Sequence, residues 1–98
     1  MSTNNVNIQY RRGGRDYRRR TFSLDEIRES TLGNLIREDG LTTGLSDFEV
    51  YVTHQDSESE IAANNLENSL ESILRSASED GEISGSYVVD VTAVHRGA

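Results

Sequence analysis

The sequence predicts one small α+β domain whose strands and helices follow the order β-β-α-β-α-β. Three segments alternate apolar and polar residues with the period of a half-buried strand, and two segments between them carry apolar residues at helical spacing. The chain has 98 residues, which is enough for one domain and not for two. We therefore expect a single domain over residues 1–98, with a disordered start (residues 1–5) and a flexible C-terminal tail (residues 95–98).

Residues 6–22 are predicted to form a β-hairpin. Apolar residues from Val6 to Tyr10 alternate with polar ones, as in a half-buried strand. Gly13-Gly14 is a strong turn signal, because both glycines can adopt positive φ. The return strand alternates less cleanly and is expected to have one solvent-exposed face, since it carries Arg18, Arg19 and Arg20.

The region after the hairpin predicts helix, with two competing start signals. Ser23 with Glu26 fits a capping box, whereas Ser30 or Thr31 would cap a shorter helix. We favour a main helix near residues 31–38, with a turn ahead of it and Gly40 as its left-handed C-cap. A second helix is predicted over residues 61–77, because apolar residues at helical spacing form one stripe there: Leu66, Leu70, Ile73, Leu74 and Ala77.

Residues 47–53 form the clearest predicted strand, and residues 87–94 form the last one. Because successive side chains point to opposite faces of a sheet, Val89 and Val91 should face the core. The same alternation directs Asp90 and Thr92 of the last strand, and Tyr51 of the third, to the outer face. The segments between these elements, residues 54–60 and 78–86, are predicted to be polar loops.

Two segments of the chain carry a family resemblance. STLGNLIREDGL (residues 30–41) resembles the first helix of ThiS/MoaD-type sulfur carriers and ubiquitin-like proteins. YVVDVTAVHRGA (residues 87–98) resembles their last strand and tail. With the hairpin in front, the resemblance implies a β-grasp (ubiquitin-like) domain, in which a mixed sheet packs on one main helix and the second helix is an addition. The chain departs from the family pattern in ending with Gly97-Ala98 instead of Gly-Gly, and in the length of residues 54–86.

The resemblance implies that the tail, Val94, His95, Arg96, Gly97 and Ala98, is a conjugation tail. The chain would be a modifier of the bacterial ubiquitin-like kind. A ubiquitin-activating-type adenylating enzyme would use ATP to activate its C-terminal carboxylate before conjugation to target proteins. A conjugating enzyme and a peptidase that removes Ala98 are further partners that the resemblance allows. Glycine suits such a tail because its backbone can be approached closely and can take any φ, although a frayed terminus of small residues would look the same.

Two other functions stay open from the sequence. A ThiS/MoaD-type sulfur carrier would convert the tail into a thiocarboxylate, and the Gly97-Ala98 ending counts against it. A non-conjugated β-grasp adaptor would use the Arg-rich hairpin for binding. All three hypotheses describe a binding or carrier protein and not an enzyme.

The predicted partner surfaces are the outer sheet face, with Tyr51, Asp90 and Thr92, and the hairpin arginines Arg18, Arg19 and Arg20. With Tyr10 and Tyr17, these arginines resemble a nucleic-acid patch in composition. Residues 21–98, however, hold four Arg and sixteen acidic residues, which would repel a polyanion beyond a Debye length of ~8–10 Å. Nucleic acid is therefore not expected as a partner. We expect the arginines to bind an acidic protein or to balance the chain's own acidic segment, residues 47–82.

Composition excludes several classes of function. The chain has no Cys, which excludes disulfides, thiolate metal sites and a cysteine nucleophile. With two His residues and no catalytic constellation, neither a metal site nor a cofactor of its own is expected. No apolar run approaches the ~20 residues of a membrane helix, and the N-terminus lacks the layout of a signal peptide. We therefore expect a cytoplasmic monomer that does not bind membranes.

Overall fold

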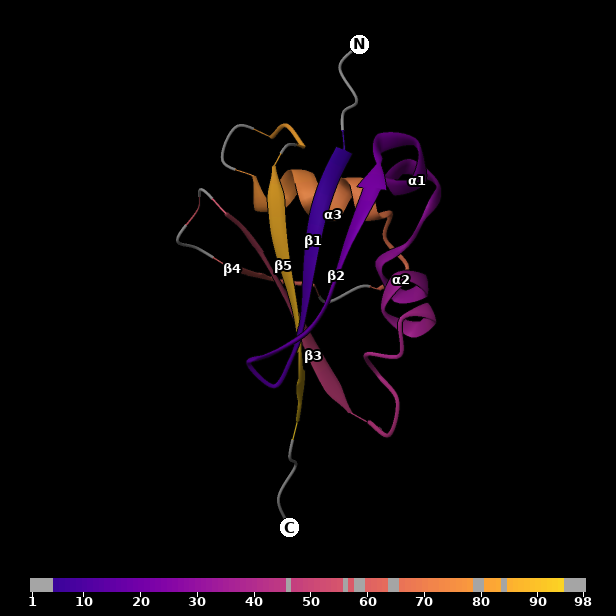
Figure 1. Ribbon diagram of the computed structural model, residues 1–98, viewed down its shortest axis with the longest axis vertical. Helices are drawn as coiled ribbons and strands as arrows, with labels where there is room; N and C mark the ends of the chain where they lie inside the picture. The colour runs from indigo at the N-terminus through magenta and orange to yellow at the C-terminus, as the bar shows by residue number, and fades with distance from the viewer. Residues whose placement is uncertain are drawn as a thin grey trace.

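A computed structural model describes residues 5–45, 47–55, 57, 60–63, 66–78, 81–83 and 85–94. In these ranges the chain forms a five-stranded sheet and three short helices (Figure 1). The elements in chain order are β1 (Asn5–Arg12), β2 (Arg15–Ser23), α1 (Leu24–Glu29), α2 (Leu32–Glu38), β3 (Phe48–His54), β4 (Glu60–Ala62), α3 (Leu70–Ala77) and β5 (Ser86–Ala93).

The sheet is open and mixed, with the strand order β2-β1-β5-β3-β4. The last strand, β5, lies in the middle of the sheet, where it runs parallel to β1 and antiparallel to β3. The hairpin partner β2 and the short strand β4 form the two edges. This is a single β-grasp-like domain, as the resemblance of the two segments implied.

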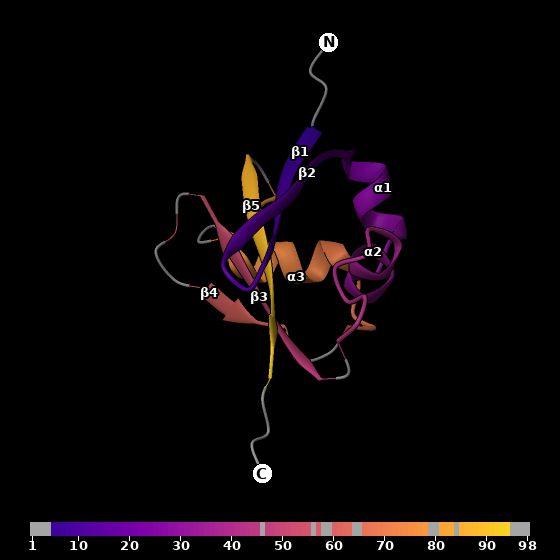
Figure 2. The same cartoon turned by 60° about the horizontal axis from the view of Figure 1, so that its bottom comes forward.

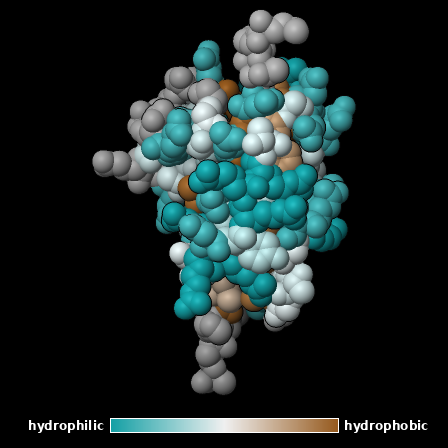
Figure 3. Space-filling view, in the orientation of Figure 1, coloured by the Kyte–Doolittle hydropathy of each residue, from teal (hydrophilic) through white to brown (hydrophobic). Residues whose placement is uncertain are grey.

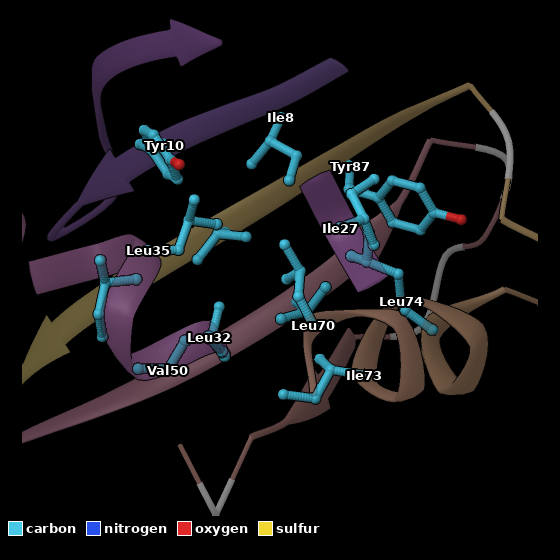
Figure 4. Packing of buried hydrophobic residues seen from close by; sticks show 14 of the residues in the cluster. Ile8, Tyr10, Ile27, Leu32, Leu35, Val50, Leu70, Ile73, Leu74 and Tyr87 are labelled. Atoms are coloured by element: carbon cyan, nitrogen blue, oxygen red, sulfur yellow. The ribbon is translucent and has the colours of Figure 1, made fainter. Parts of the chain in front are cut away.

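All three helices lie on one side of the sheet, where they enclose the core; α3 runs behind β1 and β5 in Figure 1. The strands contribute alternate residues to this core, and α3 contributes the apolar stripe predicted from its sequence (Figure 4). The fully enclosed side chains include Ile8, Tyr10, Ile27, Leu32, Leu70, Leu74 and Tyr87, each 0% exposed. The opposite side of the sheet carries no helix among the described residues.

The hairpin confirms its predicted turn. Gly13 and Gly14 have φ values of 63° and 81°, which non-glycine residues rarely adopt. One irregularity interrupts the ladder, because Tyr10 pairs with Arg18 while Arg11 pairs with Asp16. Tyr17 is therefore a bulged residue without a partner on β1, and it is the most exposed large apolar side chain that the structure describes.

Both helix start signals are used. Ser23 forms the capping box with Glu26 and begins α1, and Thr31 accepts the amide N–H of Asn34 and begins α2. Two short helices therefore replace the single main helix and preceding turn of the prediction. They are separated because Ser30 is extended, at φ −105° and ψ 151°. Gly40, at φ 76°, ends the second helix as predicted.

The prediction of one helix over residues 61–77 is wrong in its first half. Residues Glu60–Ala62 form β4, which pairs with β3, and α3 begins only at Leu70, after the N-cap Ser69. Leu66 fits the apolar stripe by spacing but belongs to a turn, since its carbonyl accepts the Gly33 N–H at 2.9 Å. A Cβ on Gly33 would lie 3.0 Å from that carbonyl oxygen, so this close approach requires glycine within α2.

Candidate functional site

The C-terminal end of β5 is the candidate site, because the expected conjugation tail follows it. β1 pairs with β5 up to Val91, whose carbonyl accepts the Gly13 N–H at 2.9 Å. Beyond that point only β3 holds the strand, through the pairs of Thr92 with Glu49 and Ala93 with Phe48. The N–H of Val94 donates to the Asp47 carbonyl at 3.1 Å, which is the last described contact of the strand. The described part of β5 thus ends beside the hairpin turn, past the end of β1 (Figure 1).

The expected tail itself lies mostly outside the described residues. Val94 is described and half-buried, whereas His95, Arg96, Gly97 and Ala98 are not among the described residues. At the other end of the chain, β1 begins at Asn5, and residues 1–4 are likewise not described. The role of the tail therefore stays a prediction.

Core and outer positions on β5 follow the predicted alternation. Tyr87, Val89 and Val91 are each 0% exposed, and they anchor the strand in the middle of the core. Asp90 and Thr92 lie on the helix-free face and are half-buried. Asp90 pairs with residues of both β1 and β3, whereas Thr92 pairs only with β3. Asp90 accepts the N–H of Gly14 at the outer hydrogen-bond limit of 3.5 Å, so it ties the hairpin turn to the last strand.

The helix-free face of the sheet is polar, and Figure 3 shows it as largely hydrophilic. Tyr51 of β3 lies on this face, where its hydroxyl donates to the Glu49 carboxylate. This hydrogen bond to Glu49 is the main cause that raises the pKa of Tyr51 above its ordinary value. Nearer the hairpin, a shallow hollow of about 280 Å³ is lined by amide and guanidinium groups, including those of Asn7, Gln9, Arg11, Arg19 and Gln55. An apolar patch of the kind that ubiquitin uses is therefore not found on the described part of this face.

The three hairpin arginines do not form one surface. Arg18 and Arg20 lie opposite Tyr10 and Ile8 in the ladder, so they point to the helix side of the sheet. Arg19 lies between them and points to the helix-free face, where its Nε donates to Gln9 Oε1 at 3.2 Å. The predicted patch of Arg18, Arg19 and Arg20 is thus divided between two faces.

On the helix side, the buried carboxylate of Asp39 is the centre of the arginine contacts. Its side chain is 3% exposed, and Oδ1 lies 2.7 Å from Nη1 of Arg20 and 3.6 Å from Nη1 of Arg18. The hydrogen bond to Asp39 raises the pKa of Arg20, which stays charged in any case. These arginines therefore balance one of the chain's own carboxylates, but Asp39 lies before the acidic segment 47–82 that was expected to be their partner.

Tyr10 lies beside the same carboxylate. It is fully buried, so it is not available to stack on nucleic-acid bases. Burial first, and then the neighbouring Asp39, raise the pKa of the Tyr10 hydroxyl well above its ordinary value. Neither this hydroxyl nor Oδ2 of Asp39 makes a hydrogen bond of normal geometry with any described group.

The described ranges contain no group of three or more His, Cys, Asp or Glu side chains placed to hold a metal ion. None of the described helices has the length and apolar character needed to cross a membrane.

Comparisons of the chain with protein-family models, with curated proteins and with solved structures found no match.

One feature of functional interest was missed in the sequence, namely the short edge strand β4. The sequence predicts a loop at Glu60 and a helix that begins at Ile61, because of the apolar stripe from Leu66 to Ala77. The available signal was the short apolar run that starts at the β-branched Ile61, between polar residues on both sides.

Proposed function

We propose that this protein is a ubiquitin-like modifier that is activated at its C-terminal carboxylate and then conjugated to target proteins. The observation that carries the proposal is the position of β5. This strand is fixed in the middle of the sheet by Tyr87, Val89 and Val91, and its described part extends past the end of β1. Gly97-Ala98 follows it in the sequence. The resemblance of that segment to the tails of ubiquitin-like modifiers supports the same assignment.

The chemistry of activation explains why this position matters. An adenylating enzyme must enclose the terminal carboxylate and ATP together, so the modifier must supply an extended end that is narrow and uncrowded. Gly97 lacks a Cβ and Ala98 has the smallest side chain after it. The buried residues of β5 supply a rigid base that lowers the entropic cost of presenting this end.

The surface around the base of the tail would contact the activating enzyme. It includes Asp90 and Thr92 on β5 and Tyr51 on β3, which are half-buried and lie on the same face. Because this surface is polar, we expect partners to differ from modules that recognise an apolar patch on ubiquitin.

The proposal is tested by incubating the full chain with ATP and an adenylating enzyme from the same genome, then measuring the intact mass. We expect an adenylate, or a thioester to the enzyme, at the carboxylate of Ala98 or at that of Gly97 after removal of Ala98. An end that gains only a sulfur atom in place of oxygen would favour the sulfur carrier instead. If every such enzyme leaves the terminus unmodified, both activation hypotheses are wrong.

A matched pair of variants makes the test specific to the tail. Gly97→Val adds a β-branched side chain and should abolish activation, because the added branch restricts the backbone and blocks close approach. Ala98→Gly should keep or increase activation, since it restores the family's Gly-Gly ending. Equal activation of both variants would contradict a tail threaded into a narrow channel.

A further inference from the structure

The outer edge of β4 is open in the part of the chain that the structure describes. β4 is the last strand of the sheet and pairs only with β3, through Tyr51–Ala62, Val52–Ile61 and Thr53–Glu60. The N–H of Ala63 donates to the Val50 carbonyl at 2.8 Å, which shows that odd-numbered residues direct their backbone groups toward β3. Ala62 therefore directs its N–H and C=O away from the sheet, and no described residue pairs with them.

A groove beside this edge is lined by residues of β4, of α3 and of the segment between them. Figure 2 labels the two elements. The groove has a volume of about 390 Å³. Its apolar side is formed by Ile61, Ala63 and Ile73, and its polar side by Asn68, Ser72 and Ser76. A second hollow of about 360 Å³ continues along the edge, where Ala63 is followed by Phe48, Val50 and Leu66. An extended peptide beside β4 would thus find a backbone partner and room for side chains on the α3 side.

The two edges of the sheet differ in how they are protected. Exposed edge strands are commonly blocked by cationic residues, bulges or proline, which discourage the pairing of another strand. The β2 edge has such protection, with a bulge at Tyr17 and the run Arg18, Arg19 and Arg20. β4 has the sequence Glu-Ile-Ala, so its protection consists of its short length and one carboxylate, without a bulge, a cationic residue or proline. It is therefore the edge that is more open to an added strand, and the carboxylate favours a cationic one.

The charge of the chain identifies the kind of strand. Residues 54–82 hold eight of the seventeen acidic residues and one of the ten arginines, a balance of −7. The rest of the chain holds nine of each and is neutral, so this segment accounts for the whole net charge of −7. On the edge itself, Glu60 is an exposed carboxylate of β4 and lies on the helix-free face, because Ile61, the next residue, faces the core side. A cationic segment is attracted to this edge, whereas a nucleic acid or a second copy of the same segment is repelled.

We propose that the β4 edge binds an extended segment of a basic protein as an added strand. The backbone of the segment pairs with Ala62, and its small aliphatic side chains enter the groove beside α3. Its lysines and arginines alternate with them, so they lie on the helix-free face, where Glu60 is exposed. The site is distinct from the tail on β5, so it does not depend on activation or conjugation.

The experiment titrates the isotope-labelled full chain with a synthetic peptide of alternating lysine and valine, blocked at both ends, and follows the backbone amides by NMR. We expect shifts at Glu60–Ala63 and at Ser72–Ser76, slower hydrogen exchange at the Ala62 amide, and weakening by salt. A peptide of alternating glutamate and valine is the charge control and should not bind. Equal binding of the two peptides, or shifts confined to β2, would overturn the proposal.

Two matched pairs of variants locate the interaction. Ala62→Pro removes the outward N–H without removing a bond to β3, and should weaken binding about tenfold, whereas Ala62→Val keeps the N–H and should preserve binding. Ser76→Arg places bulk and positive charge in the groove and should also weaken binding, whereas Ser76→Glu adds bulk with the attractive charge. If Ala62→Pro does not fold, the Ser76 pair decides. Equal affinities within the Ser76 pair, or self-association of the chain through β4, would contradict a cationic strand at this site.

Discussion

On the β1–β2 hairpin, five of the six arginines meet partners within the chain, whereas the segment 54–82 carries carboxylates in excess. Arg11 pairs with Asp16 at 3.1 Å, and Arg12 donates to the Thr43 carbonyl at 2.6 Å. Arg18 and Arg20 converge on Asp39. The acidic segment 54–82 has a single arginine, Arg75, for its eight carboxylates. A run of arginines in a sequence is therefore a poor guide to a binding surface, because strand alternation and one buried acid can direct it inward.

The largest effect should come from removing the acid that holds the hairpin arginines. Asp39→Ala leaves Arg20 and Arg18 without their shared partner beside the buried Tyr10. Breaking a fully buried ion pair costs about 3–5 kcal/mol. Because the Arg20 side chain remains 36% exposed, we expect a smaller loss, about 2 kcal/mol. Urea unfolding at neutral pH measures the change.

The control for this variant is Asp16→Ala on the same hairpin. Asp16 pairs with Arg11, but its side chain is 74% exposed, so its loss should cost less than about 1 kcal/mol. If both variants lose the same stability, the hairpin charges act only at the surface and Asp39 is not their centre.

The sequence predicted the elements that local signals decide. The Gly13-Gly14 turn, the helix near residues 31–38, and the strands that became β3 and β5 follow from period and turn chemistry, and they were confirmed. The start of α3 was not predictable in this way, because Leu66 fits a helical stripe and only its contact with Gly33 in α2 places it in a turn. Such a contact between distant segments leaves no periodic signal.

The candidate surfaces show the same limit. Alternation along β2 was sufficient to separate Arg19 from its two neighbours, once the register with β1 was known. The burial of Asp39 could not be predicted, because its position after α2 in the sequence gives no sign that the hairpin arginines lie over it. The outer positions of Asp90, Thr92 and Tyr51 were predictable. A shift of the strand pairing by one residue would have turned Val89 and Val91 to the outer face.

A smaller effect should appear at alkaline pH, through Tyr10. Burial and Asp39 raise the pKa of this hydroxyl above the ordinary value of 10.0. The folded chain therefore keeps a proton that the unfolded chain loses, and stability falls as the pH rises above that value. For one titrating group, the free energy of unfolding falls by at most about 1.4 kcal/mol per pH unit. Tyr10→Phe should reduce the loss of stability above pH ~10, measured as unfolding midpoints over a pH series.

At neutral pH the same variant should change stability little, because the hydroxyl it removes has no hydrogen-bond partner among the described groups. Tyr87→Phe is the contrast. Its hydroxyl lies 2.6 Å from the Ser78 hydroxyl, so removing it should cost about 1 kcal/mol. A larger neutral-pH loss for Tyr10→Phe than for Tyr87→Phe would show that the Tyr10 hydroxyl has a firm partner.

The smallest effect concerns the excess of carboxylates itself. Glu60 is exposed on β4, within the acidic segment, and Glu60→Gln should raise stability by about 0.3 kcal/mol because it relieves repulsion from like charges. Asp16→Asn removes the same charge from the hairpin, where Arg11 is its partner, and should lower stability by a similar amount. Unfolding in denaturant, at low and at high salt, measures both, and salt should shrink both changes. Changes of the same sign would mean that the β1–β2 hairpin and the acidic segment 54–82 do not differ in their balance of charge. The attraction proposed for a basic strand at β4 would then lose its physical basis.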